Sequence, residues 1–185
     1  SAYLDGFILD ITDKKNAENK LRLTQFTVDR AKDGIIRINS DACFDYVNDA
    51  ACEHLGYSRE ELLAMSVFDI DPDFPADAWP DHWNDIFEKK HLLIESRHRR
   101  KDGTTVPVEI SLNAVETSEN QHSIAFIRDI TARKKAETYR EMGQDVLQIL
   151  NEPGELQESI NRVLTVLKAG TEVDAVGLRL QEGED

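Results

Sequence analysis

Residues 92–115 read LLIESRHRRKDGTTVPVEISLNAV and carry the clearest strand pattern in the chain. In the second half of this stretch the apolar residues occupy alternate positions and so share one face of a strand: Val106, Val108, Ile110, Leu112 and Ala114. Asp102-Gly103 stands between the two halves, and Asp-Gly between alternating stretches is a strong hairpin signal. The pattern predicts two long antiparallel strands, Leu92–Arg100 and Thr105–Val115.

Shorter strand patterns lie on both sides of this hairpin. Gly34–Ile38 and Cys43–Val47 are apolar stretches joined by the turn-forming residues 39–42, which predicts a second hairpin. Ser123–Arg128 predicts a fifth strand after the long hairpin.

Helix signals fill the region between the two hairpins. Asn48 can cap a short helix that Gly56 ends, and Ser58–Glu61 has the spacing of a capping box. Trp83 and Phe87 stand at helical spacing and predict a further helix. The order of two strands, short helices and three strands predicts an α+β fold, in which a five-stranded antiparallel sheet carries helices over one face.

One hexapeptide pattern occurs twice. Phe7-Ile8-Leu9-Asp10-Ile11-Thr12 returns as Phe126-Ile127-Arg128-Asp129-Ile130-Thr131. In both copies an apolar strand is followed by a Thr able to cap a helix and by a run rich in Lys, Ala and Glu. Because such a repeat marks the end of a structural unit, residues 1–12 are expected to be the tail of a preceding unit.

Four motifs in order resemble a PAS domain with its C-terminal PAC motif, the sensory box. They are Tyr46–Ala51, Gly56–Leu62, Arg99–Gly103 and Asp129–Thr131. The resemblance implies a sensory and dimerisation module of bacterial signalling proteins, most often sensor histidine kinases of two-component systems and cyclic-dinucleotide enzymes. It implies no catalytic activity in this part of the chain. A ligand- or partner-induced change would leave through Asp129, Ile130 and Thr131 into the following helix.

The resemblance and the repeat together predict five segments. They are the tail of a preceding PAS domain (1–12), a connecting helix (13–33), the PAS/PAC domain (34–131), a signalling helix (132–151) and the truncated start of a GAF-like domain (152–185). The GAF-like resemblance rests on an amphipathic helix that is followed by a strand pattern at Asp174–Leu180. The chain is therefore interpreted as an excerpt of a longer signalling protein.

Apolar residues recur at three- and four-residue spacing after Thr131, at Ala136, Tyr139, Gly143, Val146 and Leu150. A similar series precedes the domain, at Ala17, Leu21, Thr24, Val28 and Ala31. This spacing suits a two-stranded parallel seam, which predicts a homodimer through the flanking helices. The alternative is that each helix lies on the sheet of its own domain.

The charge balance excludes several functions. The chain has 22 Lys and Arg against 36 Asp and Glu, a net charge of −14, which argues against a nucleic-acid partner. No apolar run reaches the ~20 residues of a membrane span and no secretion signal is visible, so no direct membrane contact is expected. Cys43 and Cys52 are interpreted as free thiols of a cytoplasmic protein.

The sequence predicts no catalytic or metal-binding constellation. Asp69, Asp71 and Asp73 have the alternate spacing that opens a calcium loop, but Phe74 stands where the turn glycine belongs. The flavin-binding branch of the family has an Asn-Cys-Arg-Phe-Leu-Gln motif that this chain lacks. The haem-binding branch carries its ligand where His82 stands, a weak signal without the supporting pocket. No cofactor is predicted, and a haem- or other cofactor-bearing sensor is the alternative.

A small-molecule pocket is predicted between the sheet and the helix that carries Trp83 and Phe87, and a packed core without a ligand is the alternative. The candidates for polar contacts in this pocket are Asn48, Arg97, Glu109 and Ser111. If Asp102-Gly103 is a two-residue turn, Glu109 lies directly across the hairpin from Ser96, which favours a structural role. An architectural spacer that dimerises without sensing a ligand is the other functional reading.

Overall fold

The computed structural model describes residues 12–117, 120–153 and 155–170. The chain divides into two compact units between Asp129 and Ile130. The first unit carries the sheet, and the second carries two helices. The strand predicted at 174–180 and all but the last residue of the tail predicted at 1–12 lie outside the described residues.

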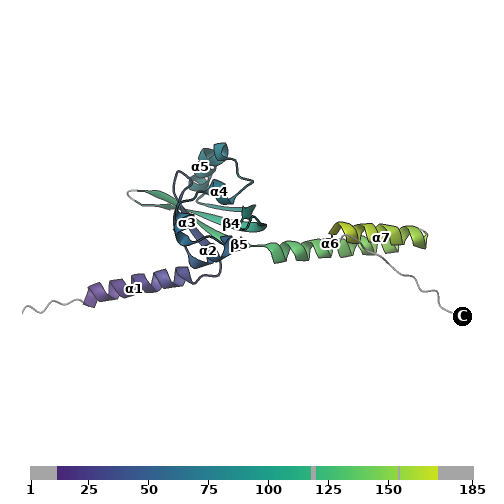
Figure 1. Cartoon of the computed structure of the whole chain (residues 1–185), viewed down its shortest axis with the longest axis horizontal. Coiled ribbons are helices and arrows are strands. Elements are labelled where there is room, and N and C mark those ends of the chain that lie inside the picture. Colours follow the sequence, from purple (N-terminus) through teal and green to yellow (C-terminus); the bar gives the residue numbers. More distant parts are fainter. Residues whose placement is uncertain (1–11, 118–119, 154, 171–185) are drawn as a thin grey trace, which may run out of the picture. The chain divides into compact units, whose positions relative to one another are not determined.

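The first unit is an α+β domain built on one antiparallel sheet (Figure 1). Its strands are β1 (Gly34–Ile38), β2 (Phe44–Val47), β3 (His91–Arg99), β4 (Thr105–Glu116) and β5 (Gln121–Asp129). They lie in the order β2-β1-β5-β4-β3, and neighbouring strands pair antiparallel. The predicted five-stranded antiparallel sheet is confirmed.

One helix precedes the sheet, and short helices connect its second and third strands. They are α1 (Thr12–Asp29), α2 (Asp49–Leu55), α3 (Arg59–Leu63), α4 (Val67–Ile70), the 3-10 turn η1 (Ala76–Ala78) and α5 (Trp79–Lys89). The Asn48 side chain caps α2 by accepting the N–H of Ala51, and Gly56 ends this helix with a φ of 77°. Ser58–Glu61 forms a capping box at the start of α3. All three helix signals of the sequence are confirmed.

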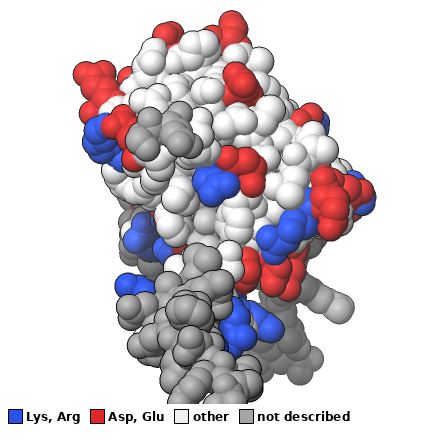
Figure 2. All heavy atoms as spheres, turned by 90° about the vertical axis from the view of Figure 1, so that its left-hand side faces the viewer, with Lys and Arg blue, Asp and Glu red and all other residues white. Residues whose placement is uncertain are grey.

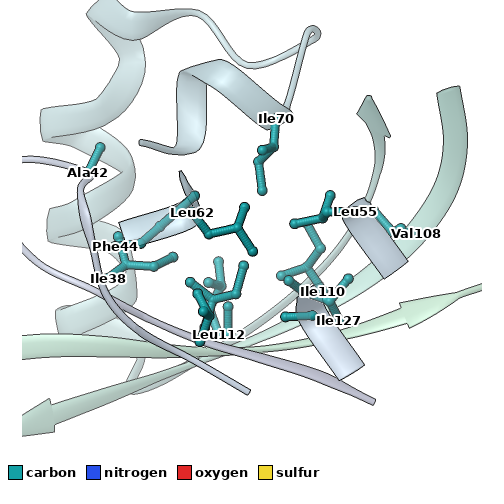
Figure 3. Packing of buried hydrophobic residues seen from close by; sticks show 14 of the residues in the cluster. Ile38, Ala42, Phe44, Leu55, Leu62, Ile70, Val108, Ile110, Leu112 and Ile127 are labelled. Atoms are coloured by element: carbon teal, nitrogen blue, oxygen red, sulfur yellow. The ribbon is translucent and has the colours of Figure 1, made fainter. Parts of the chain in front are cut away.

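An apolar core lies between helices α2 to α5 and one face of the sheet. Figure 3 shows Leu62 and Ile70 from the helical layer opposite Ile110, Leu112 and Ile127 from the strands. Alternate residues of β4 are buried, as its pattern predicts. Because successive side chains of a strand point to opposite faces, the intervening polar residues of β4 lie on the face away from this core.

The turn of the long hairpin differs from the prediction by one residue. The N–H of Arg100 donates to the carbonyl of Thr104 at 2.8 Å, so residues 101–103 form a three-residue loop. Gly103 closes the loop with a φ of 85°, which glycine adopts without strain. The Cα partner of Glu109 is therefore Glu95. The prediction that Glu109 lies directly across from Ser96 is wrong.

The second unit contains α6 (Thr131–Asn151) and α7 (Leu156–Gly170). The two helices pack against each other and bury Met142, Ile149 and Val163. Ile130 occupies the N-cap position of α6, and Thr131 is the first residue of the helix. Thr131 thus begins the helix instead of capping it.

Candidate functional site

A small cavity lies inside the first unit, between the sheet and the segment that runs from α4 to α5. Its volume is about 40 Å³, and all five strands contribute to its mostly apolar lining. Figure 3 shows several lining side chains, among them Phe44, Ile70, Ile110 and Leu112. A cavity needs a volume of roughly 10–15 Å³ to hold one group of the size of a water molecule. The cavity therefore has room for about three such groups.

Three polar side chains interrupt the apolar lining: Asp71, His82 and His98. Asp71 is 3% exposed, and its carboxylate accepts the Ser96 hydroxyl at 2.7 Å and the Asp73 N–H at 3.0 Å. Burial raises the pKa of Asp71. Arg97 pairs with the more exposed Asp73 at 2.6 Å, and no ion pair to Asp71 occurs within the described residues. Asp71 is thus a buried carboxylate that makes no direct ion pair in this part of the chain, although the charge of Arg97, which is paired with Asp73, acts on it.

His98 lies on the cavity wall in contact with a second histidine, His54 of α2. His98 is 3% exposed, and the two ring centroids are 6.0 Å apart. Within the described residues, neither His98 Nδ1 nor His54 Nε2 has a hydrogen-bond partner, and both atoms are buried. Burial lowers the pKa of His98 to about 3. Burial also lowers the pKa of His54, and the charge of Arg100 lowers it further. Both rings are therefore neutral at pH 7.

The His54–His98 pair leads from the cavity to the end of β5. The charges of Arg100 and Asp129 both act on the His54 ring. Arg100 Nη2 donates to Asp129 Oδ2 at 3.2 Å. Asp129 ends β5 and directly precedes Ile130, the N-cap of α6. A series of neighbouring side chains thus joins the cavity wall to the first residue of the predicted signal junction.

Aromatic rings form part of the helical wall of the cavity. The ring of Phe74 lies 5.0 Å from that of His82 and 6.0 Å from that of Trp79, measured between centroids. Trp79 Nε1 donates to the carbonyl of Ser40 at 2.7 Å, which fixes the indole. Burial lowers the pKa of His82. These three rings make the helical wall aromatic and uncharged at pH 7.

None of the six predicted pocket residues lines this cavity. Asn48 is fully buried, and its Oδ1 accepts the N–H groups of Ile35 and Ala51 at 2.8 and 2.9 Å. Its Nδ2 donates to the carbonyls of Val28 and Asp33, each at 3.1 Å. Because the backbone already uses the hydrogen-bonding groups of its amide, Asn48 has a structural role.

Trp83 and Phe87 belong to the packed core. The ring of Trp83 lies 5.7 Å from that of Trp79 and 4.8 Å from that of Phe87. The aromatic wall expected from α5 exists one turn earlier, since Trp79 and His82 line the cavity. The helical spacing of Trp83 and Phe87 therefore predicted α5 correctly. The α5 residues that line the cavity lie about one turn closer to the start of this helix.

Arg97, Glu109 and Ser111 occupy strand positions that alternate with the buried ones. Arg97 makes a two-point ion pair with Asp73. Glu109 is paired in register with Glu95, and Ser111 Oγ lies 3.0 Å from His91 Nε2. These three polar candidates therefore do not meet in the cavity.

Sequence reasoning missed the two most deeply buried polar groups of the cavity, Asp71 and His98. His98 shares the alternate positions of β3 with Leu92 and Ile94, which was a usable signal for an inward side chain. Asp71 lies among several aspartates in an irregular segment. No spacing rule distinguishes its buried carboxylate from its exposed neighbours.

On the face shown in Figure 2, the charged side chains of the described residues do not gather into a patch of one sign, because acidic and basic side chains are interspersed. The part of the chain that the structure describes contains no group of three His, Cys, Asp or Glu side chains suited to a metal ion. None of its helices has the length and apolar composition needed to cross a membrane.

The cavity does not fit haem or flavin. Ligand and cofactor pockets measure roughly 300–1,000 Å³, whereas this cavity measures about 40 Å³. The His82 ring packs against Phe74 and Trp79, so these neighbours occupy space that a haem would need beside its ligand.

Comparisons with known proteins agree with this architecture. A family model described as "PAS domain" matches residues 32–132. The "Methyl sulfide methyltransferase-associated sensor" of Methanosarcina acetivorans is 29% identical, over 81% of this chain and 15% of its own length. The "Sensor protein kinase WalK" of Staphylococcus haemolyticus is 27% identical, over 84% of this chain and 24% of its own length. The chain thus spans less than a quarter of either relative.

A solved structure of a PAS domain from a two-component sensor histidine kinase is also similar. It is 31% identical, with a TM-score of 0.53, over 61% of this chain and 98% of that chain.

Proposed function

The chain belongs to the PAS domain family, and on this basis we propose that it senses a small molecule in the cavity and relays the change through Asp129, Ile130 and Thr131 to α6. Its similarity to a sensor and a sensor kinase supports signal transduction as the process. The proposed parent is a sensor histidine kinase of a two-component system.

The observation that carries this proposal is the series His98, His54, Arg100 and Asp129. His98 and His54 are neutral and keep buried ring nitrogens without partners, so a new hydrogen bond at the cavity can reorient them without breaking an old one. The side chains of Arg100 and Asp129 are 33% and 37% exposed, and such partly solvated pairs contribute little to stability. A small displacement at the cavity can therefore reach Asp129, which directly precedes Ile130, the N-cap of α6.

Arg100→Gln is expected to interrupt this relay. Ala125→Val adds two methyl groups to the cavity wall and should shift the backbone amide resonances of residues 131–137. When Ala125→Val is made in a chain that also carries Arg100→Gln, we expect these shifts to be less than half as large as in the chain with Arg100. The reason is that the link between His54 and Asp129 is lost. The measurement compares ¹H–¹⁵N correlation spectra with and without Ala125→Val, first in the wild-type chain and then in the Arg100→Gln chain.

The matched control is Arg99→Gln, which removes the adjacent arginine, whose Nη2 donates to the carbonyl of Asp69. Equal shifts of the α6 amides in the Arg99→Gln and Arg100→Gln backgrounds would exclude the proposed route.

We also propose a parallel homodimer through the flanking helices. Large apolar side chains on α6 remain exposed: Tyr139 (58%), Leu147 (61%) and Leu150 (60%). Leu23 and Phe26 are similarly exposed on α1. Val146 is half-buried, so Leu147 is a better candidate for the centre of the seam than Val146. Two stripes of this kind, one on each chain, would bury each other in a coiled-coil contact.

Leu147→Glu is expected to weaken this dimer at least tenfold. Each copy loses the burial of one leucine, worth roughly 1.5–3 kcal/mol, and gains a charge in the seam. Sedimentation velocity over a concentration series measures the change. Thr138→Glu is the control, since residue 138 is exposed, lies nine residues and therefore about 180° around α6 from Leu147, and gains the same charge. A wild-type chain that stays monomeric at high concentration would contradict the dimer.

The remaining parts of the proposal concern the longer protein. We propose that residues 1–12 end a preceding PAS domain, that 13–33 and 132–151 are connecting and signalling helices, and that 152–185 begin a GAF-like domain. The PAC motif is assigned to the end of the 34–131 domain. The proposal places no catalytic site in this chain and locates it in the cytoplasm, where Cys43 and Cys52 remain free thiols.

One observation favours a second candidate function, an architectural spacer that dimerises without a ligand. The cavity of about 40 Å³ is small for a metabolite site. An unchanged melting temperature across a panel of small molecules, together with a stable dimer, would favour the spacer over the sensor.

A further inference from the structure

We propose that the cavity binds a small alkylammonium cation whose ammonium group contacts Asp71, an inference that rests on the proposed sensory function of this cavity. Asp71 is one of the two most deeply buried polar side chains of the cavity lining, beside His98.

The first argument is the unpaired charge of Asp71. An ionised carboxylate offers about four acceptor positions. The Ser96 hydroxyl and the Asp73 N–H occupy two of them, and the Phe74 N–H interacts more weakly with the same carboxylate. Buried charges in proteins are normally paired, because an isolated one is costly to remove from water. The cavity lining contains no Lys or Arg, and Arg97 is engaged by Asp73. A cationic ligand supplies the missing partner.

The second argument is the composition of the remaining wall. Phe74 and Trp79 present aromatic rings to the cavity, and a cation within about 6 Å of a ring centroid is attracted to its face. The aliphatic side chains of the strands offer an apolar surface for an alkyl group. An anion would instead meet the Asp71 carboxylate, and a neutral molecule would leave that charge unpaired. The lining thus fits a cation with an apolar body.

The third argument is size. A cavity of about 40 Å³ has room for about three or four non-hydrogen atoms. Ethylammonium, with one nitrogen and two carbons, is a probe of this size. Since even the best small ligands gain only about 1.5 kcal/mol per non-hydrogen atom, a Kd no tighter than about 1 mM is expected.

The experiment compares three probes of similar size and different charge: ethylammonium, ethanol and acetate. Each is titrated into the full 185-residue chain at constant ionic strength, and ¹H–¹⁵N spectra follow the amides of β3, β4 and β5. We expect saturable shifts with ethylammonium and at least tenfold weaker binding of ethanol and acetate. Ethanol or acetate that binds as tightly as ethylammonium would overturn the proposed ligand class.

Two variants locate the site. Asp71→Asn removes the charge and should weaken ethylammonium binding at least tenfold, whereas Asp77→Asn makes the same change at an exposed position of the same segment and should leave it unchanged. Ala125→Val reduces the volume of the cavity, leaves the Asp71 side chain in place and should also weaken binding, so the test remains decisive if Asp71→Asn does not fold. Binding that survives Ala125→Val in a folded chain would place ethylammonium elsewhere.

The ligand class and the sensory function can fail separately. If ethylammonium binds at Asp71 while the amides of residues 131–137 do not move, the ligand class stands and the relay is wrong. If Ala125→Val shifts those amides in an Arg100-dependent way while ethylammonium does not bind, the relay stands and the ligand class is wrong.

Discussion

Asn48→Ala is expected to lower the free energy of unfolding by about 4 kcal/mol, the largest effect of any single substitution considered for this chain. The side chain is fully buried and makes four hydrogen bonds to backbone groups. Alanine leaves the N–H groups of Ile35 and Ala51 and the carbonyls of Val28 and Asp33 without this partner. Each of the two orphaned buried N–H groups costs about 1–3 kcal/mol. The two carbonyls are only partly buried, and that of Val28 still accepts the N–H of Ala31, so they cost less.

Urea unfolding of the wild type and the variant measures this loss. Asn39→Ala is the matched control, because the Asn39 side chain accepts two backbone N–H groups in a half-buried turn and its removal should cost about 1 kcal/mol. Asn48→Asp retains both acceptor contacts but turns an oxygen toward two carbonyls, so it should also destabilise the domain strongly. A loss below 1.5 kcal/mol for Asn48→Ala would contradict the central role of this side chain.

Asn48 also illustrates which parts of the fold the sequence could predict. Its capping of α2, the end of that helix at Gly56 and the capping box Ser58–Glu61 depend on residues within a few positions of one another. Its bonds to Val28 and Ile35 depend instead on where α1 and β1 lie. Local signals therefore predict that Asn48 caps α2. They do not show its contacts with Val28 and Ile35, so the sequence alone leaves its amide available for a ligand.

The register of the long hairpin shows a second limit. Asp102-Gly103 predicts a tight turn, but the same pair fits a two-residue loop or the end of a three-residue loop. The structure has the longer loop, in which Asp102 Oδ1 accepts the N–H of Thr104 at 2.9 Å. A difference of one residue changes every cross-strand partner, which is why Glu109 is paired with Glu95.

The cavity was the least predictable feature, because burial is a tertiary property. Asp71 and Asp73 stand two residues apart in the same acidic segment, yet Asp71 is 3% exposed and the Asp73 side chain is 39% exposed. The contacts that separate them, Ser96 for Asp71 and Arg97 for Asp73, come from adjacent residues of a strand more than 20 positions later. Only the folded position of that strand assigns a different partner to each aspartate.

His98 should make the domain markedly less stable in acid. Burial lowers its pKa to about 3, and the positive charge of protonated His54 acts in the same direction. In the unfolded chain a histidine titrates near pH 6.5. Between these two values the unfolded state binds a proton that the folded state does not, so stability falls as the pH drops below 6.5 and is constant above it. At pH 4 the loss from this residue is about 3 kcal/mol.

The test compares wild type with His98→Leu, which removes the titrating group and leaves every other ionisable side chain in place. The free energy of unfolding is measured in urea at pH 7.5 and at pH 4. Carboxylates contribute to the acid loss of both chains and cancel in the comparison, so the wild type should lose about 3 kcal/mol more than the variant. Any packing change caused by leucine shifts both pH points alike. If wild type and His98→Leu lose the same free energy of unfolding between pH 7.5 and pH 4, His98 takes up a proton in the folded state. Water would then reach the cavity wall at His98.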